Sequence, residues 1–326
     1  MNSNVHTFRT VVEPLRHQGL ITHDRPGLMV GSCFTDNIGS RLTQDLFNLT
    51  INPFGTLYNP ASIAQAIDRL ATGEPYETAD LVSHEGRWHS MHHHSSFSAD
   101  TPEACLKSIN EALAESHDRF TGTRWCVVTL GSAWVWVRHG EIVANCHKLP
   151  SSEFQRIMLS VDDAEECLTH IMSSLPQETT VIFTVSPIRH KGDGAHGNQL
   201  SKSTLLLAID HIVASNPDRA IYFPSFEIMM DDLRDYRFYA ADMRHPSETA
   251  IDYIYSLFKD SFFSESTTAL AQECHRLWQR LAHRPLTAAG TRQARLQRLS
   301  AIELARKMAL DHPELQDPIA RMISNY

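Results

Sequence analysis

Five short apolar segments, each bounded by turn residues, constrain the fold of this chain more than any other feature. Helical patterns or long excursions separate the segments, which are 27–31 (GLMVG), 46–51 (LFNLTI), 124–131 (RWCVVTLG), 180–187 (TVIFTVSP) and 219–225 (RAIYFPS). Continuous apolar runs of this length are typical of strands buried on both faces of a parallel sheet. The alternation of strands and helices predicts an α/β fold, with a five-stranded parallel sheet inside a three-layer α/β/α sandwich.

Turn and capping signals predict how the other segments are organised. Asn59 and Pro60 begin a helix as N-cap and first helical residue, a polar loop over 188–199 precedes another helix, and a last helix has Pro246 in its first turn. His139-Gly140 predicts a β-hairpin turn. We therefore expect a main domain over residues 1–262, with an insertion at about 71–120 that includes an amphipathic helix, and a helical C-terminal extension over 263–326.

Charge and composition narrow the classes of partner. The net charge is −9 and the chain has no long basic run, so we expect no nucleic-acid binding. No stretch approaches 18 apolar residues and the N-terminus lacks an apolar signal core, so we expect no membrane association. The six cysteines have no paired spacing, which favours a reducing compartment and a cytoplasmic location.

Ser32 directly follows the first apolar segment and precedes a helical pattern. A serine there can be a plain N-cap, or a nucleophile whose attack places negative charge beside a helix N-terminus. The segment ADMRHPS places Asp242 three residues before His245, where the carboxylate can hold the imidazole in one tautomer. Together these residues predict a nucleophile (Ser32), a general base (His245) and an orienting carboxylate (Asp242).

Nine motifs in order resemble the GSCFA family: Gly31-Ser32-Cys33-Phe34, NPFG, TLGSAW, NCHK, SPIRH, SKSTLL, YFPSFE, DDLRDYRFY and DMRHPS. The resemblance covers residues 8–262, with Thr35 where alanine is usual. That family looks like a branch of the SGNH (GDSL-like) hydrolases, which implies a flavodoxin-like sheet and the triad Ser32, His245 and Asp242. It implies no substrate.

The resemblance also implies an oxyanion hole. The N–H groups of Ser32 and Gly55 would supply two donors. The block that usually reads Gly-x-Asn is Gly131-Ser132-Ala133 here, so its asparagine is missing. Losing one such donor costs about 3 kcal/mol of transition-state stabilisation. Either a group near Gly131 replaces it, with Asn145 in VANCHK as the candidate, or activity is modest.

Cys33 is the rival nucleophile, because a helix N-terminus can lower the pKa of a thiol. Its side chain would point about 100° around the helix from Ser32, toward the strands. We therefore expect Cys33 to be a buried packing residue without a catalytic role.

Histidines gather in the interior segment SMHHHSSF. His92 and His94 would share one face of an extended segment, a spacing that some metal sites use. Carboxylate partners at ligand spacing are absent from the segment, so we expect no metal and assign both residues to substrate binding.

Arg189 and His190 follow the fourth apolar segment directly, and Lys191 comes next. They would bind a carboxylate or phosphate of the substrate, or instead pair with the acidic run at 231–235. Trp134 and Trp136 would either stack on a sugar ring or pack against the protein, and packing is the favoured interpretation.

These inferences predict a serine-dependent ester hydrolase that needs no cofactor and acts on a small acylated molecule, with an acylated carbohydrate as the first expectation. Two alternatives remain. The same acyl-serine could donate to a sugar hydroxyl, which would make the protein an acyltransferase, or the protein could be a catalytically silent carbohydrate-binding module. The sequence leaves three roles open for the helical extension, which would cover the active site, pack against the sheet or mediate a homo-oligomer.

Overall fold

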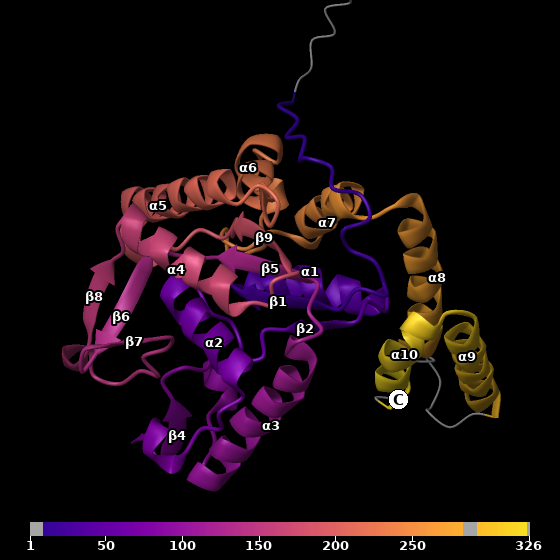
Figure 1. Cartoon of the computed structure of the whole chain (residues 1–326), viewed down its shortest axis with the longest axis horizontal. Coiled ribbons are helices and arrows are strands. Elements are labelled where there is room, and N and C mark those ends of the chain that lie inside the picture. Colours follow the sequence, from indigo (N-terminus) through magenta and orange to yellow (C-terminus); the bar gives the residue numbers. More distant parts are fainter. Residues whose placement is uncertain (1–8, 283–291, 325–326) are drawn as a thin grey trace, which may run out of the picture.

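The computed structural model describes residues 9–282 and 292–324. Its centre is a five-stranded, all-parallel sheet between helices (Figure 1). The strands pair in the order β10-β9-β5-β1-β2, with the bounds β1 Gly27–Gly31, β2 Leu49–Ile51, β5 Trp125–Leu130, β9 Thr180–Val185 and β10 Ala220–Tyr222. Counted along the chain, this is the 2-1-3-4-5 order of flavodoxin-like sheets. The five predicted strands and the predicted fold class are confirmed.

Helices cover both faces of the sheet. One layer contains α2 Pro60–Thr72, α3 Pro102–Phe120, α4 Val161–Ser174 and α5 Gly194–Ser215, and the other contains α1 Cys33–Gln44 and α7 Glu248–Phe262. The short α6 Ser225–Glu227 places Phe226 in the core under the first layer. Alternate residues of β1 point into different cores. Leu28 and Val30 join the cluster under the first layer, and Met29 joins the cluster under the second. Burial on both faces explains why the strand segments read as continuous apolar runs.

Two antiparallel units extend from this sandwich. A hairpin joins β3 Leu81–His84 to β4 Arg87–Ser90, and a small sheet has the order β7-β6-β8, with β6 Trp134–Arg138, β7 Glu141–Val143 and β8 Gln155–Met158. The predicted turn at His139-Gly140 joins β6 to β7, and both residues have positive φ (+52° and +87°) as a type I′ turn requires.

Three helix starts test the capping predictions. Asn59 caps α2 by accepting a hydrogen bond from the Ser62 N–H at 2.8 Å, with Pro60 first in the helix as predicted. Pro246 was expected in the first turn of α7, but the helix begins at Glu248 because Ser247 is the cap. The predicted loop over 188–199 is shorter than expected, because α5 already begins at Gly194 and the second half of the segment forms its first turns.

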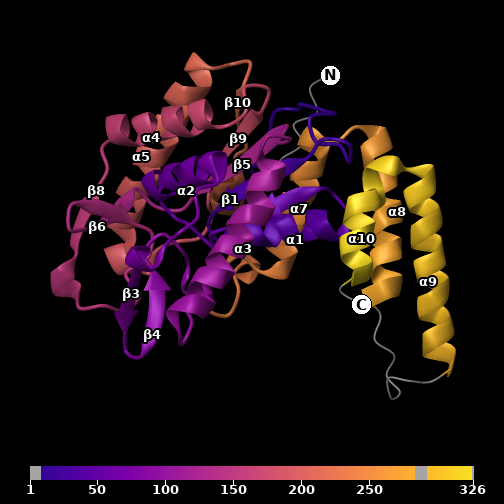
Figure 2. The same ribbon diagram turned by 60° about the horizontal axis from the view of Figure 1, so that its bottom comes forward.

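The C-terminal extension consists of α8 Glu265–Ala282, α9 Arg292–Asp311 and α10 Gln316–Ser324. Its helices share a small core that includes Leu46, just after α1. Arg321 donates to Asn48 Oδ1 at 2.8 Å, and the carbonyl of Asn48 accepts from the Gly27 N–H at the start of β1. The extension therefore packs where the strands begin, beside the end of α1 (Figure 2).

None of the helices in the described ranges is both long and apolar enough to cross a membrane.

Candidate active site at the carboxyl edge of the sheet

The candidate site lies where the parallel strands end. Ligands of open α/β sheets bind at this edge, and β1 ends immediately before Ser32. Helices α1 and α7 run side by side and in the same direction, since Arg41 pairs with Asp252 at 2.7 Å and Asp45, directly after α1, accepts from the Tyr255 hydroxyl further along α7 at 2.7 Å. The residues that precede these two helices, including Ser32 and His245, therefore lie at the same edge.

Asp242 and His245 form the contact that their spacing predicts. Nδ1 of His245 lies 2.5 Å from Oδ2 of Asp242. Oδ1 of Asp242 accepts the N–H groups of His245 at 3.0 Å and Arg244 at 2.9 Å. The backbone N–H and the side chain of His245, followed by the N–H of Arg244, hold the pKa of Asp242 well below its usual range. The side chains of His245 and Asp242 are 48% and 42% exposed, so the pair is open to solvent.

Ser32 is held in the turn between β1 and α1. It is 1% exposed, and its Oγ accepts from the Phe34 N–H at 3.3 Å as the cap of α1. The preceding residue, Gly31, has φ +138°, and a Cβ there would lie 2.2 Å from the carbonyl oxygen of Thr129. Asn52 accepts from the Gly31 N–H at 2.8 Å, which ties the turn to the segment after β2.

Cys33, expected to be buried, is only half-buried and is the more accessible of the two candidate nucleophiles. The capping role of Ser32 explains this difference, because its Oγ turns back to the Phe34 N–H. Burial is the largest influence on the Cys33 thiol and raises its pKa, whereas the backbone N–H groups of Cys33 and Phe34 act in the opposite direction. Within residues 9–282 and 292–324, no hydrogen bond joins His245 to either candidate nucleophile.

The three backbone N–H groups predicted to form the oxyanion hole already have partners in this structure. The N–H groups of Ser32, Gly55 and Gly131 donate to the carbonyl oxygens of Thr129 (3.1 Å), Asn52 (2.7 Å) and Tyr58 (2.7 Å). The Oδ1 of Asn145 accepts from the His147 N–H at 3.0 Å. An oxyanion hole built from the three N–H groups would require them to leave their carbonyl partners.

His92 and His94 have different neighbours. The ring of His92 lies 6.2 Å from that of Tyr76. Nδ1 of His94 accepts from the Ser96 N–H at 3.2 Å, and its Cβ lies against Gly55. In the part of the chain that the structure describes, no group of three histidine, cysteine, aspartate or glutamate side chains is arranged to hold a metal ion.

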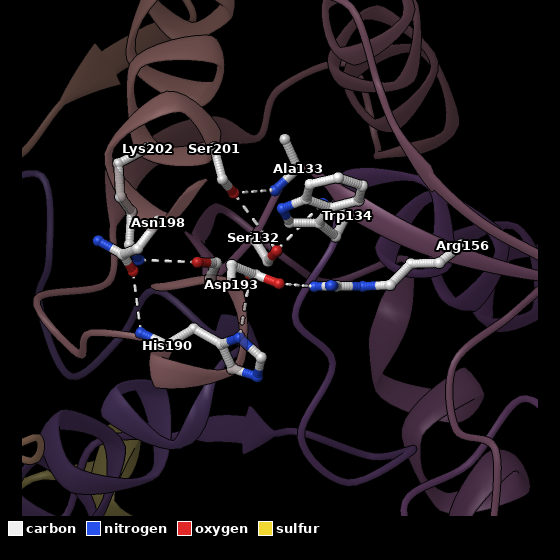
Figure 3. A network of polar contacts seen from close by, with 10 residues as sticks. Ser132, Ala133, Trp134, Arg156, His190, Asp193, Asn198, Ser201 and Lys202 are labelled. Atoms are coloured by element: carbon white, nitrogen blue, oxygen red, sulfur yellow. Dashed lines mark hydrogen bonds and ion pairs between the residues drawn. The ribbon is translucent and has the colours of Figure 1, made fainter. Parts of the chain in front are cut away.

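His190 takes part in a polar network after β9 (Figure 3). Its Nδ1 lies 3.0 Å from Asp193, which also pairs with Arg156. The guanidinium of Arg156 lies over the rings of Trp134 and Trp136, 4.3 and 5.4 Å from their centroids. The structure therefore shows the favoured packing role of the two tryptophans.

Lys202 was missed by the sequence analysis. Its ammonium is buried and donates to the carbonyl oxygens of Gly131 at 2.7 Å and Ser186 at 2.8 Å. Burial lowers the pKa of Lys202 to about 7. The neighbouring Ser201 accepts from the Ala133 N–H at 2.8 Å. Helix α5 thus fixes the loops after β5 and β9, a role that a lysine in the motif SKSTLL does not reveal.

These features define a flavodoxin-like α/β protein with an Asp–His pair, a buried lysine and two candidate nucleophiles at the carboxyl edge of its sheet. The model of the GSCFA family matches residues 27–258, so the chain belongs to the GSCFA family. A comparison with curated proteins gives no match.

Proposed function

We propose that the protein is an acyl hydrolase of the SGNH type, which cleaves an ester bond of a small acylated molecule through a covalent acyl-enzyme. The 2.5 Å contact between His245 Nδ1 and Asp242 Oδ2 carries the proposal. With Nδ1 held by the carboxylate, Nε2 is the ring nitrogen that can take a proton from a nucleophile.

The nucleophile attacks the ester carbonyl while its proton passes to His245. Collapse of the tetrahedral intermediate breaks the C–O bond, and the imidazolium returns the proton to the leaving alkoxide. His245 then takes a proton from water, which attacks the acyl-enzyme. The bond between the acyl group and the nucleophile breaks, the imidazolium returns the proton to the nucleophile, and the carboxylic acid leaves. Asp242 keeps the imidazole in one tautomer throughout. Both members of the pair are about half exposed, so water reaches the base. This exposure favours hydrolysis over transfer to a sugar hydroxyl.

Ser32 is the nucleophile that the sequence predicts, and Cys33 is the second candidate. Exposure favours the thiol, because the substrate carbonyl has to reach the attacking atom, and Ser32 is 1% exposed whereas Cys33 is only half-buried. Since burial raises the pKa of Cys33, the thiol would need His245 to remove its proton.

Mass spectrometry after exposure to p-nitrophenyl acetate tests the proposal. We expect one acetyl adduct on the wild type, which peptide mapping places at residue 32 or 33. Ser32→Ala and Cys33→Ala identify the nucleophile, because only one of them prevents adduct formation. His245→Ala slows acetylation by roughly 10²- to 10⁴-fold, the usual contribution of a general base.

His211→Ala is the matched control, because His211 is an exposed histidine on α5 that pairs with Glu165. It acetylates at the wild-type rate. The hydrolase proposal is overturned if the folded wild type forms no adduct, or if acetylation persists when residues 32 and 33 are both alanine. A binding module without catalysis is then the better description.

A further inference from the structure

A cavity of about 850 Å³ lies between the start of α5 and the segment that leads to the Asp242–His245 pair. This volume is in the range of small-molecule sites. Met243, which follows Asp242, contributes to its wall, as do Arg189 and Asn198 on the other side. The cavity therefore borders the proposed base.

Positive charge dominates the wall of this cavity. Three fixed cations, Arg189, Lys191 and Arg234, line it against one carboxylate, Asp235. Arg234 pairs with Asp231 at 3.0 Å. Among the described residues, Arg189 and Lys191 pair with no carboxylate. The guanidinium of Arg189 instead lies 3.0 Å from the sulfur of Met230.

The acidic run at 231–235 does not neutralise the cations after β9. Asp232 pairs with Arg9 at 2.7 Å, and Asp235 pairs with Arg237 at 3.6 Å. With Asp231 bound to Arg234, each carboxylate of the run has another partner. Of the two interpretations of Arg189 that the sequence left open, the structure thus disfavours the internal ion pair.

Asn198 adds a donor that has no acceptor. It lines the cavity and is 3% exposed. Its Oδ1 accepts from the His190 N–H at 2.9 Å, which fixes the orientation of the amide, while Nδ2 has no partner (Figure 3). An unsatisfied buried donor costs about 1–3 kcal/mol, so it calls for an explanation. An oxygen atom of a ligand in the cavity would supply one.

We propose that the cavity binds an oxyanion group, a phosphate or carboxylate, on the acylated substrate, with Arg189 and Asn198 as donors and Lys191 as a further cation. Met229, Met230 and Tyr239 line the same cavity and take the adjoining hydrocarbon. The inference rests on the proposed function in one respect, namely that the occupant is the substrate of the same site. The expected substrate is then an anionic acylated molecule and not the neutral acylated sugar that the sequence suggested.

Isothermal titration with octyl phosphate, octanoate and octyl glucoside tests this inference. The three probes share a chain and differ in the head group, and each is used below its micelle concentration. We expect both anions to bind, and the neutral glucoside to bind at least tenfold more weakly. The anion that binds more tightly shows whether the natural group is a phosphate or a carboxylate. Added salt weakens the anion binding, because it screens the charges.

Two variants test the donors. Arg189→Gln lowers the affinity for the anion by roughly 10- to 100-fold, because it removes one charge-assisted hydrogen bond to the ligand. Lys191→Gln changes an exposed residue that folding tolerates, and it lowers the affinity less. Arg306→Gln, which removes an exposed cation of α9 far from the cavity, keeps wild-type affinity. Equal binding of the glucoside, no binding of either anion, or wild-type affinity in both Arg189→Gln and Lys191→Gln would overturn the inference.

The two proposals can fail separately. If octyl phosphate or octanoate binding depends on Arg189 but p-nitrophenyl acetate leaves no adduct, the anion site stands without the hydrolase. If the acetyl adduct forms on residue 32 or 33 but neither anion binds, the hydrolase stands and the anionic substrate is excluded.

Discussion

At the carboxyl edge, hydrogen bonds offset the free-energy cost of burying polar side chains, and Lys202 is the clearest case. Its pKa is about 7 in the folded chain, against 10.5 in the unfolded chain. Between these values the unfolded chain binds more protons, so the free energy of unfolding rises with pH by up to about 1.4 kcal/mol per unit. We expect urea unfolding from pH 7 to about 8.5, below the range in which ionisation of the thiols of Cys126, Cys167 and Cys274, whose pKa burial raises, acts in the opposite direction, to show this rise in the wild type and to lack it in Lys202→Met. Lys307→Met, at an exposed position, keeps the rise; equal slopes in both variants would contradict the assignment.

His93 gives a pH dependence of the same sign in a more acidic range. It is 1% exposed, lies among the rings of Phe54, Tyr76 and Phe97, and burial lowers its pKa to about 3. Below pH 6.5 the imidazole of His93 binds a proton in the unfolded chain but not in the folded chain. The free energy of unfolding therefore falls by about 1.4 kcal/mol for each pH unit of acidification. His93→Phe keeps the packing and removes one proton from this dependence. Denaturation curves at pH 4.5 and 7 measure the change, and an unaltered acid loss would show that His93 is not its source.

Residue identity predicted the Asp242–His245 contact but not the accessibility of the nucleophiles. The contact is local, three residues apart, and so its spacing is visible in the sequence. The exposure of Ser32 and Cys33 depends on which one caps α1, and that is a choice of side-chain rotamer. The unsatisfied amide of Asn198 and the buried ammonium of Lys202 depend on distant loops, which no local pattern reveals.

At the scale of elements, the turn between β1 and α1 is the most constrained part of the site. Gly31→Ala places a Cβ against the Thr129 carbonyl at a φ of +138°, and we expect it to cost more than about 3 kcal/mol. Gly86→Ala is the control, because Gly86 has φ +76° but a Cβ added there would meet no atom within 4 Å. It should cost about 1–2 kcal/mol from backbone strain alone. Urea unfolding measures both, and similar costs would mean that the turn can relax.

The strands of the central sheet were predictable because burial on both faces leaves a continuous apolar run. The strands outside it were harder to see. In β8, exposed Gln155 and Ile157 alternate with half-buried residues, and the segment is too short and polar to stand out. The early start of α5 was also missed, because its first turn contains two glycines, which are typical of loops.

At the scale of the whole molecule, the C-terminal helices are fixed to the edge opposite the candidate site. Leu277 is 1% exposed in their core, so Leu277→Ala should cost about 2–5 kcal/mol. Leu310→Ala, at a position 78% exposed, should change stability by less than about 0.5 kcal/mol. Neither should alter the affinity for octyl phosphate, since the sites are remote. A weaker affinity in folded Leu277→Ala would reveal coupling between the two edges.

Asp45 joins the extension to the sandwich, because it accepts from Tyr255 of α7 at 2.7 Å and pairs with His275 of α8 at 2.9 Å. The open edge, with its cavity, thus faces away from a firmly attached group of helices. The C-terminal helices therefore offer a side for attachment that leaves the ligand-binding edge accessible. Protein tethered to a sensor surface through the exposed side of α9 would present its ligand-binding edge to the flowing solution in every copy.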